Sequence, residues 1–467
     1  MPAKYHIHTR KASPRVRPVG KLGIVDWRED CASCHNCVKK ACVYGLYRDE
    51  AERLRNENGY LDYIYQCKGC LNCIQNCTKN ILTRVINPEY ERLGDDYFTP
   101  DIILSTWYQA ETGSIPVSGA GYGGPFKGPG FDSMWTDMSE IVRPTRDGIH
   151  GREYINTSVD IGRKLGHLTF EAGNLVDSPP PLIESPMPIL FDLLPEYYDR
   201  GPVFESVVKA AAQIGLLAVV TGNRAKNAPY AIRGNVVPAL QGTETLGNRA
   251  VERASLVMIE DCANIASIRT SMKRRNPDQI VAVRVPAAPG LAKRVLELAG
   301  LGIEVIMLAF NAHGREVNCP APRHMRDVIR EVHQTLTRAG TRDEVTLVSS
   351  GGIAMAEHVT KAILCGVDLV AIDLPLMVAL ECRLCGECSR HQACAIALEK
   401  IETDYAVQRI VNLMAAWRNQ LIEMLGAMGI REARRLRGEV GRCMFSEDLE
   451  RNTFGRLFGK RKMQELI

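Results

Sequence analysis

Twelve of the sixteen cysteines in this 467-residue chain lie in three short groups, and this grouping constrains the fold more than any other feature. The groups read CASCHNCVKKAC, CKGCLNCIQNC and CRLCGECSRHQAC. Gaps of two residues are too short for each cysteine to pair with its neighbour in a disulfide, and secreted disulfide scaffolds are usually much smaller. We therefore expect an intracellular protein whose thiolates bind metal.

The first two groups both begin with the spacing C-x2-C-x2-C. This spacing places three thiolates round an iron–sulfur cluster, and the fourth ligand comes from the other group. The predicted ligands are Cys31, Cys34, Cys37 and Cys77 for one [4Fe-4S] cluster, and Cys67, Cys70, Cys73 and Cys42 for the other. Residues 21–90 thus resemble the bacterial ferredoxin module with two clusters. Two zinc sites are the alternative, but zinc has no use for the third cysteine of each run.

The third group follows the apolar run DLVAIDLPLMVAL. Its cysteines are Cys382, Cys385, Cys388 and Cys394, and together they could bind a third [4Fe-4S] cluster. Alternatively, all except Cys385 bind a [3Fe-4S] cluster, or the group binds zinc. The isolated cysteines are interpreted as buried or incidental thiols: Cys262, Cys319, Cys365 and Cys443.

Between the second and third cysteine groups, short apolar runs alternate with helical stretches. Continuous apolar runs predict strands that are buried on both faces, and hence a parallel sheet. Seven runs occur, at 187–193, 216–222, 255–261, 279–286, 304–310, 345–352 and 368–373. They favour an α/β fold with a (β/α)8 TIM-type barrel in which one strand is unidentified; an open doubly wound sheet is the alternative.

A glycine pair ends the strand at 345–352. Ser350, Gly351 and Gly352 end this strand, and a helix begins shortly afterwards. Glycines let a phosphate approach the backbone amides, and the start of a helix favours its negative charge. In barrels this position is the usual phosphate site, although a tight turn explains a glycine pair equally well.

We predict five segments along the chain. The N-terminal 21 residues carry six Lys or Arg and no acidic residue, which favours a disordered arm over a segment that docks on a partner subunit. Near the other end, apolar residues at helical spacing after residue 402 predict a helix that either caps the barrel or forms an exposed interface, and a basic stretch follows it. The segments are 1–20, a basic arm; 21–90, the ferredoxin-like domain; 91–180, a lead-in; 181–395, the barrel with the third cysteine group; and 396–467, a basic helical extension.

Bulk composition excludes several classes of protein. The net charge of +4 is too small to indicate nucleic acid as a partner. No apolar stretch reaches the roughly 18 residues of a membrane span, and the start of the chain lacks a secretory signal. No G-x-G-x-x-G motif opens a βαβ unit, so the sequence indicates no nicotinamide site. We expect a cytoplasmic protein.

Several further stretches resemble the FMN-binding domain of glutamate synthases, of the archaeal type in which a ferredoxin module precedes that domain. They are YQAETGSIPVSG, TDMSEIVRPTRDG, HQTLTRAGTRDEVTLVSSGGI and MVALECRLCGEC. The resemblance implies FMN in a barrel, with an iron–sulfur cluster bound just after the last strand. It matches Gly351 and Gly352 to the flavin-phosphate glycines, three cysteines of the third group to cluster ligands, and Arg284 to a strand lysine near the flavin and the keto acid. For Arg284 a surface salt bridge at the barrel mouth is the alternative.

Three stretches depart from the family. AFNAHGREVN replaces a glycine-rich strand end that receives the substrate, Asp373-Leu374 replaces Gly-Thr beside the phosphate, and the opening strand lacks its small residues. A carboxylate beside a phosphate is repulsive unless it is protonated or a cation intervenes. His313 on the divergent loop is interpreted as a solvated histidine rather than a catalytic one.

These features predict an iron–sulfur flavoprotein oxidoreductase subunit that relays electrons between [4Fe-4S] clusters and FMN within a multisubunit redox complex. Its partners would be other redox subunits, such as an amidotransferase-like chain or one linked to NAD(P)H or ferredoxin. A glutamate synthase subunit that reduces 2-iminoglutarate is the second hypothesis. A scaffold with clusters but no flavin is the third.

Overall fold

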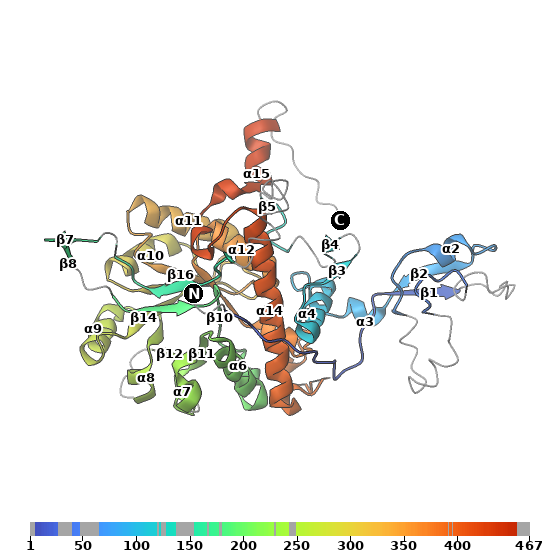
Figure 1. Ribbon diagram of the computed structural model, residues 1–467, viewed down its shortest axis with the longest axis horizontal. Helices are drawn as coiled ribbons and strands as arrows, with labels where there is room; N and C mark the ends of the chain where they lie inside the picture. The colour runs from blue at the N-terminus through green and yellow to red at the C-terminus, as the bar shows by residue number, and fades with distance from the viewer. Residues whose placement is uncertain are drawn as a thin grey trace.

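The structure, a computed structural model, describes residues 5–26, 40–46, 65–118, 121–122, 128–136, 154–165, 168–176, 180–227, 230–241, 249–390, 392–394 and 396–454. Eight parallel strands close into a barrel in sequence order, and the last strand pairs with the first (Figure 1). The strands are β10 (Ile189–Phe191), β11 (Ala218–Thr221), β12 (Val236–Leu240), β13 (Leu256–Glu260), β14 (Ile280–Pro286), β15 (Val305–Ala309), β16 (Thr346–Ser350) and β17 (Leu369–Ile372). The predicted TIM-type barrel is confirmed, and the open sheet is excluded because the barrel is closed.

Helices surround the barrel, as expected when each parallel strand is followed by a helix that covers the sheet. Their apolar residues recur at helical spacing and face the strands, as in the helix where Val328, Val332 and Leu336 are all buried. The helices are α6 (Gly201–Ile214), α7 (Gly222–Asn227), α8 (Arg249–Arg253), α9 (Ile265–Arg275), α10 (Leu291–Gly300), α11 (Met325–Arg338), α12 (Ala356–Cys365) and α13 (Leu374–Ala379).

A long helix, α14 (Thr403–Ala427), runs along one side of the barrel. The Glu402 carboxylate caps its start by accepting the backbone N–H groups of Asp404 and Tyr405. The helix packs against α6, α12 and α4 (Pro100–Thr112) and is buried along most of its length. Of the two alternatives, the structure therefore shows a helix packed on the barrel and not an exposed interface.

Residues 5–20 of the basic arm pack against the rest of the protein, contrary to the expected disorder. The side chain of Arg409 on α14 donates to the carbonyl of Ala12, and the amide of Asn412 donates to the carbonyl of Arg10. Arg409 and Asn412 are fully buried, so their donors need partners, and the arm supplies them. Charge composition could not predict these contacts, because the arm makes them with its backbone carbonyls.

A small lobe lies on the far side of α4 from the barrel (Figure 1). Its strands β1 (Leu22–Asp26) and β2 (Leu82–Ile86) are antiparallel, and α2 (Asn72–Gln75) and α3 (Pro88–Glu91) accompany them. The buried core of its described part is small: Ile24, Cys42, Leu46 and Cys73. Cys31, Cys34 and Cys37 lie outside the described residues.

Short antiparallel pairs complete the structure. They are β3 (Val117–Ser118) with β4 (Gly121–Tyr122), β5 (Met134–Thr136) with β18 (Cys443–Phe445), β6 (Val159–Gly162) with β9 (Leu182–Ser185), and β7 (Phe170–Glu171) with β8 (Asn174–Leu175). A last short helix, α15 (Ser446–Leu449), follows β18. Within the described ranges, none of the helices is both long and apolar enough to span a membrane.

Candidate functional site

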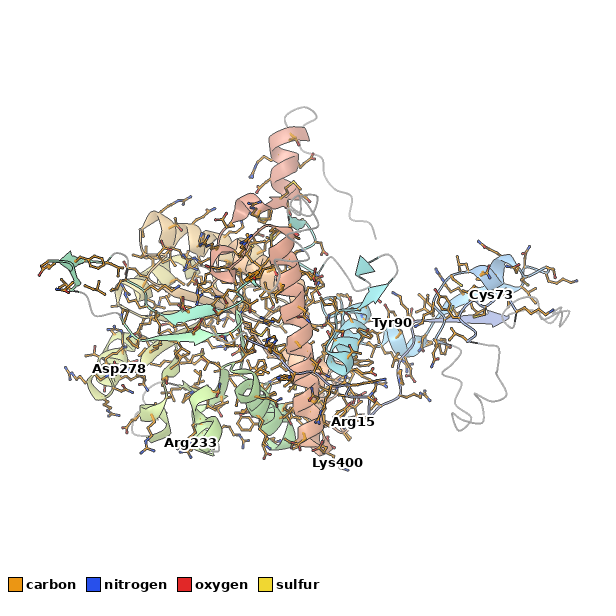
Figure 2. The ribbon with its side chains drawn as sticks, viewed as in Figure 1. Arg15, Cys73, Tyr90, Arg233, Asp278 and Lys400 are labelled. Carbon is orange, nitrogen blue, oxygen red and sulfur yellow. The ribbon has the colours of Figure 1, made fainter. Side chains whose placement is uncertain are left out.

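The thiol of Cys42 joins the second cysteine group in the small lobe. Burial raises the pKa of the Cys73 thiol, and the nearby Cys67, Cys42 and Cys70 raise it further. Such thiols cannot all ionise together unless a cation is bound between them. The structure thus brings together the four residues that the spacing predicts for one cluster. Figure 2 shows Cys73 in the lobe, well away from the barrel.

Cys77 is the described ligand of the other predicted cluster. Nearby backbone N–H groups, chiefly that of Ile81 and also those of Lys79, Leu82 and Asn80, lower the pKa of its thiol. A lowered pKa favours the thiolate, which is the form that binds iron. The role of Cys77 as a ligand stays a prediction.

The third cysteine group lies beside the segment that follows β10 at the barrel mouth. Cys382 is buried, and desolvation raises the pKa of its thiol to about 12. The thiols of Cys388 and Cys394 are close enough to act on it, and Cys385 acts in turn on Cys388. The hydroxyl of Tyr198 stands 2.7 Å from the sulfur of Cys388. All four predicted residues are thus neighbours.

The backbone is strained beside two of the cysteine groups. Leu71, Leu384 and Glu381 have φ values of 61°, 49° and 74°, in the left-handed region that non-glycine residues rarely adopt. Such conformations persist only where the surroundings enforce them, and they cluster at functional sites. They lie directly after Cys70, between Cys382 and Cys385, and directly before Cys382.

The arm holds the strained Glu381 in place. The Glu381 carboxylate is almost fully buried; it accepts the backbone N–H of Arg15 at 2.8 Å and the Arg15 Nε at 3.1 Å. The Arg15 guanidinium also lies 3.5 Å from the carbonyl oxygen of Ile396, and Figure 2 labels Arg15. Sequence reasoning missed this pair because 366 residues separate its members.

Arg284 projects from β14 into the carboxyl end of the barrel and is only 17% exposed. Its guanidinium lies 2.6 Å from Asp192, which follows β10, and 3.2 Å from the hydroxyl of Ser350 at the end of β16. That hydroxyl also donates to Asp192, and Glu260 lies 3.8 Å from the Arg284 Nε. Arg284 is therefore paired at the mouth, but its pair with Asp192 is buried and is not the surface salt bridge given as the alternative.

Two further carboxyl groups surround this pair. Burial raises the pKa of Asp373 to about 6, and the charge of Asp192 adds to the rise. Burial also raises the pKa of Glu260, although Arg284 opposes the rise. Three carboxyl groups thus share one arginine, and the mouth is acidic when all of them are ionised.

The glycine pair adopts the conformation that only glycine accepts easily. Gly351 and Gly352 have φ values of 85° and 69°. A Cβ on Gly352 would lie 2.2 Å from the Cα of Gly314, so the pair is needed for close packing of two loops. Two residues after Gly352, the backbone N–H of Ala354 donates to Nδ1 of His358. This amide is therefore unavailable to a phosphate. The predicted role of the glycines in binding phosphate stays a prediction.

One cavity lies between the rim of the barrel mouth and the third cysteine group. It measures about 1270 Å³. Residues that follow β10 and β11 line one side, and the cysteine group lines the other. Among the lining residues are Tyr197, Tyr198, Thr221, Leu374, Cys382 and Cys388.

The comparisons with known proteins agree with this geometry. A family model described as a conserved region in glutamate synthase matches residues 322–431, which include β16, β17, the third cysteine group and α14. The chain is 26% identical to an archaeal-type glutamate synthase (NADPH) of Dehalococcoides mccartyi, over 89% of this chain and 93% of that protein. This chain is a relative of the glutamate synthases.

The archaeal glutamate synthase (NADPH) of Methanocaldococcus jannaschii is 24% identical, over 88% of this chain and 92% of that protein. Among solved structures, a mutant flavocytochrome b2 with pyruvate bound has a TM-score of 0.40 and 12% identity, over 71% of this chain and 88% of that chain. The resemblance to glutamate synthases that the sequence motifs indicate is confirmed.

Relative to the glutamate synthase pattern, the divergent loop makes contacts of its own. Nε2 of His313 lies 3.0 Å from Asp95, and its ring stacks on Tyr97 with centroids 5.3 Å apart. Tyr97 in turn donates to the carbonyl of Gly352 at 2.6 Å. His313 is half-exposed and ties this loop to the lead-in segment.

In the described part of this glutamate synthase relative, no three His, Cys, Asp or Glu side chains are arranged to hold a single metal ion. The ligands of a four-iron cluster bind different irons, so they stand farther apart than the ligands of one ion. The sequence motifs did not reveal Asp192 or Tyr198. Both follow β10, and only the closed barrel brings them to residues far along the chain.

Proposed function

We propose that this chain is an iron–sulfur flavoprotein oxidoreductase subunit that relays electrons between [4Fe-4S] clusters and FMN, working with other redox subunits in the cytoplasm. The observation that carries the proposal is the shared cavity, because the third cysteine group and the residues that follow β10 and β11 at the carboxyl end of the barrel line it together. Its volume exceeds the range of about 300–1,000 Å³ typical of small-molecule sites, so it has room for a flavin ring.

The thiol groups fit iron–sulfur clusters by the chemistry of their donors. Cys42, Cys67, Cys70 and Cys73 are neighbours, and nearby backbone N–H groups lower the pKa of the Cys77 thiol. Cys382, Cys388 and Cys394 would hold the third cluster, with Cys385 next to them. Sulfur ligands that accept hydrogen bonds are a standard means of setting cluster potentials.

The ring end of an FMN site fits, and its phosphate end fits on one condition. Arg284 is buried at the mouth, where a cation can polarise a flavin carbonyl. Asp373 follows β17 at the same end as Gly352 follows β16, since Ser350 and Ala371 are opposite one another. A phosphate there requires Asp373 to be protonated, and the raised pKa of this carboxyl favours that form.

FMN, when bound, couples one-electron transfer at clusters to two-electron chemistry. The residues of this chain would orient and enclose it. Asp192 and Ser350 hold the Arg284 guanidinium in one direction. Phe98, Leu374 and other apolar residues line the cavity and exclude water.

A working glutamate synthase subunit is the second candidate, and the names of the relatives favour it. The charge at the mouth argues against it. A keto acid needs a free cation for its carboxylates, whereas Arg284 is already paired with Asp192 and lies near Glu260. We therefore rank electron relay above 2-iminoglutarate reduction.

An assay of anaerobically purified protein tests the proposal. About twelve irons with equal acid-labile sulfide and one FMN are expected for three [4Fe-4S] clusters, and about eleven irons if the third is [3Fe-4S]. Flavin oxidation by 2-oxoglutarate plus ammonia would establish the second candidate. Iron and sulfide without flavin would leave a scaffold, and zinc in place of iron would overturn both candidates.

A further inference from the structure

We propose that Tyr198 tunes the third cluster by donating a hydrogen bond to the sulfur of Cys388, which raises the reduction potential of that cluster. The inference rests on the proposed function, since it requires a cluster at the third cysteine group. It assigns a positioning and tuning role to a residue outside the cysteine motifs.

The geometry supplies the hydrogen bond. The Tyr198 hydroxyl lies 2.7 Å from Cys388 Sγ. In a free thiol either atom could be the donor, but a cysteine that binds iron has lost its proton. The tyrosine hydroxyl is then the donor of the two, and its partner is a charged sulfur.

The fold holds this hydroxyl in place. Tyr198 ends a short 3-10 helix, Glu196–Tyr198, which follows β10, and its N–H donates to the carbonyl of Pro195 at 2.8 Å. Its side chain is only 8% exposed and belongs to the main core. The ring of Tyr197 packs edge-on against it, with centroids 5.3 Å apart. Burial in this setting leaves little room for the hydroxyl to turn away.

The hydrogen bond stabilises the reduced cluster more than the oxidised one. Reduction adds negative charge to the cluster and its sulfur ligands, and a donor aimed at a sulfur offsets that charge. A hydrogen bond to a charged sulfur is stronger than one between neutral groups, and only part of its free energy differs between the two oxidation states. We expect about a tenfold effect on the reduction equilibrium.

The test is a redox titration of the full anaerobic chain, followed by electron paramagnetic resonance. Tyr198→Phe removes the donor and keeps the ring, so the midpoint of the third cluster should fall by about 59 mV, which is tenfold for one electron. Tyr108→Phe is the control, because Tyr108 is exposed on α4 and is not among the described residues that line the cavity, and its midpoint should equal that of the wild type. An unchanged midpoint in Tyr198→Phe would overturn the inference.

A second replacement guards against loss of the cluster in the phenylalanine variant. 3-Fluorotyrosine at position 198 keeps the hydroxyl and makes it a stronger donor, so the midpoint should rise. A fall or no change would contradict a donor role. A protein with no third cluster at all would refute the proposed function as well, whereas a protein with the cluster but no FMN would leave this inference intact.

Discussion

The guanidinium of Arg284 lies 2.6 Å from the carboxylate of Asp192, across the mouth of a closed barrel. The two residues come from strands on different sides of the barrel, β14 and β10, and Ser350 bridges them from β16. This buried pair occupies the end of the barrel where active sites are built. The charges of this pair determine the electrostatic environment of any ligand that binds at the mouth.

Removing one partner of this pair should destabilise the protein. Asp192→Ala leaves a buried guanidinium whose other ion-pair partner, Glu260, is more distant, and losing one partner of a buried pair costs about 3–5 kcal/mol. Urea unfolding followed by tryptophan fluorescence, at equal iron and flavin content, measures the loss. Glu331→Ala breaks a half-exposed pair with Arg323 and should cost less than about 1 kcal/mol. Equal losses for the two variants would refute the prediction.

Asp373→Asn should stabilise the protein at alkaline pH and strengthen FMN binding there. The folded pKa of Asp373 is raised to about 6 from an ordinary value of 3.8, so its stabilising share is complete below pH 3.8 and is lost as pH rises through 6. The variant has no such loss and should gain roughly 1–3 kcal/mol over the wild type at pH 8, but nothing at pH 4.

The measurements are melting temperature and the FMN dissociation constant between pH 4 and pH 8. Asp278→Asn is the control, because Asp278 is exposed on the barrel surface and far from the mouth (Figure 2). A wild type and an Asp373→Asn variant with parallel pH profiles would contradict the assigned carboxyl.

Acid should destabilise the barrel through two buried histidines. Burial lowers the pKa of His358 to about 3 and that of His324 to about 4. For a base with a lowered folded pKa, stability is complete above the ordinary value of 6.5 and is lost as pH falls toward the folded value. Melting temperature should therefore decline steadily from pH 6.5 to pH 4, and His358→Gln should flatten that decline.

His6→Gln is the control for this profile, since His6 has an exposed side chain. The slope with pH is the relevant quantity, because a substitution in the core also shifts stability at every pH. If His358→Gln lowers the melting temperature but keeps the wild-type slope, the buried histidine is not the source of the acid sensitivity.

Removing iron should unfold the small lobe while the barrel stays folded. Two of the four buried residues in the core of its described part are Cys42 and Cys73, so that core depends on the cysteines. After chelation under oxidising conditions, limited proteolysis should cut within residues 21–90 and leave a resistant fragment with the barrel. The untreated protein serves as the control, and cleavage spread equally over the chain would refute the separation.

The barrel could be predicted because its strands are short and apolar. The missing eighth strand was β12, and it carries Pro238, which cannot donate to a sheet and therefore masks a strand in the sequence. The order of the N-terminal arm could not be foreseen. Its partners, Arg409 and Asn412, lie about 400 residues away, and they bind its backbone.

The candidate site, like the fold, was only partly predictable from the sequence. The spacing of the cysteines is a local property, so the ligand groups could be named from the sequence. Arg284 could be placed at the mouth, but its pairing with Asp192 depends on barrel closure. Tyr198 has no motif at all, and only its position against Cys388 distinguishes it from Tyr197.

The contacts between the arm and α14 have a consequence for biosynthesis. The backbone carbonyl of Arg10 accepts a hydrogen bond from the side-chain amide of Asn412, which lies 402 residues later in the chain. This part of the arm can therefore reach its partner only after Asn412 has been translated. Because Arg15 of the same arm donates to Glu381 beside Cys382, the surroundings of the third cysteine group can form only after that group itself has been translated.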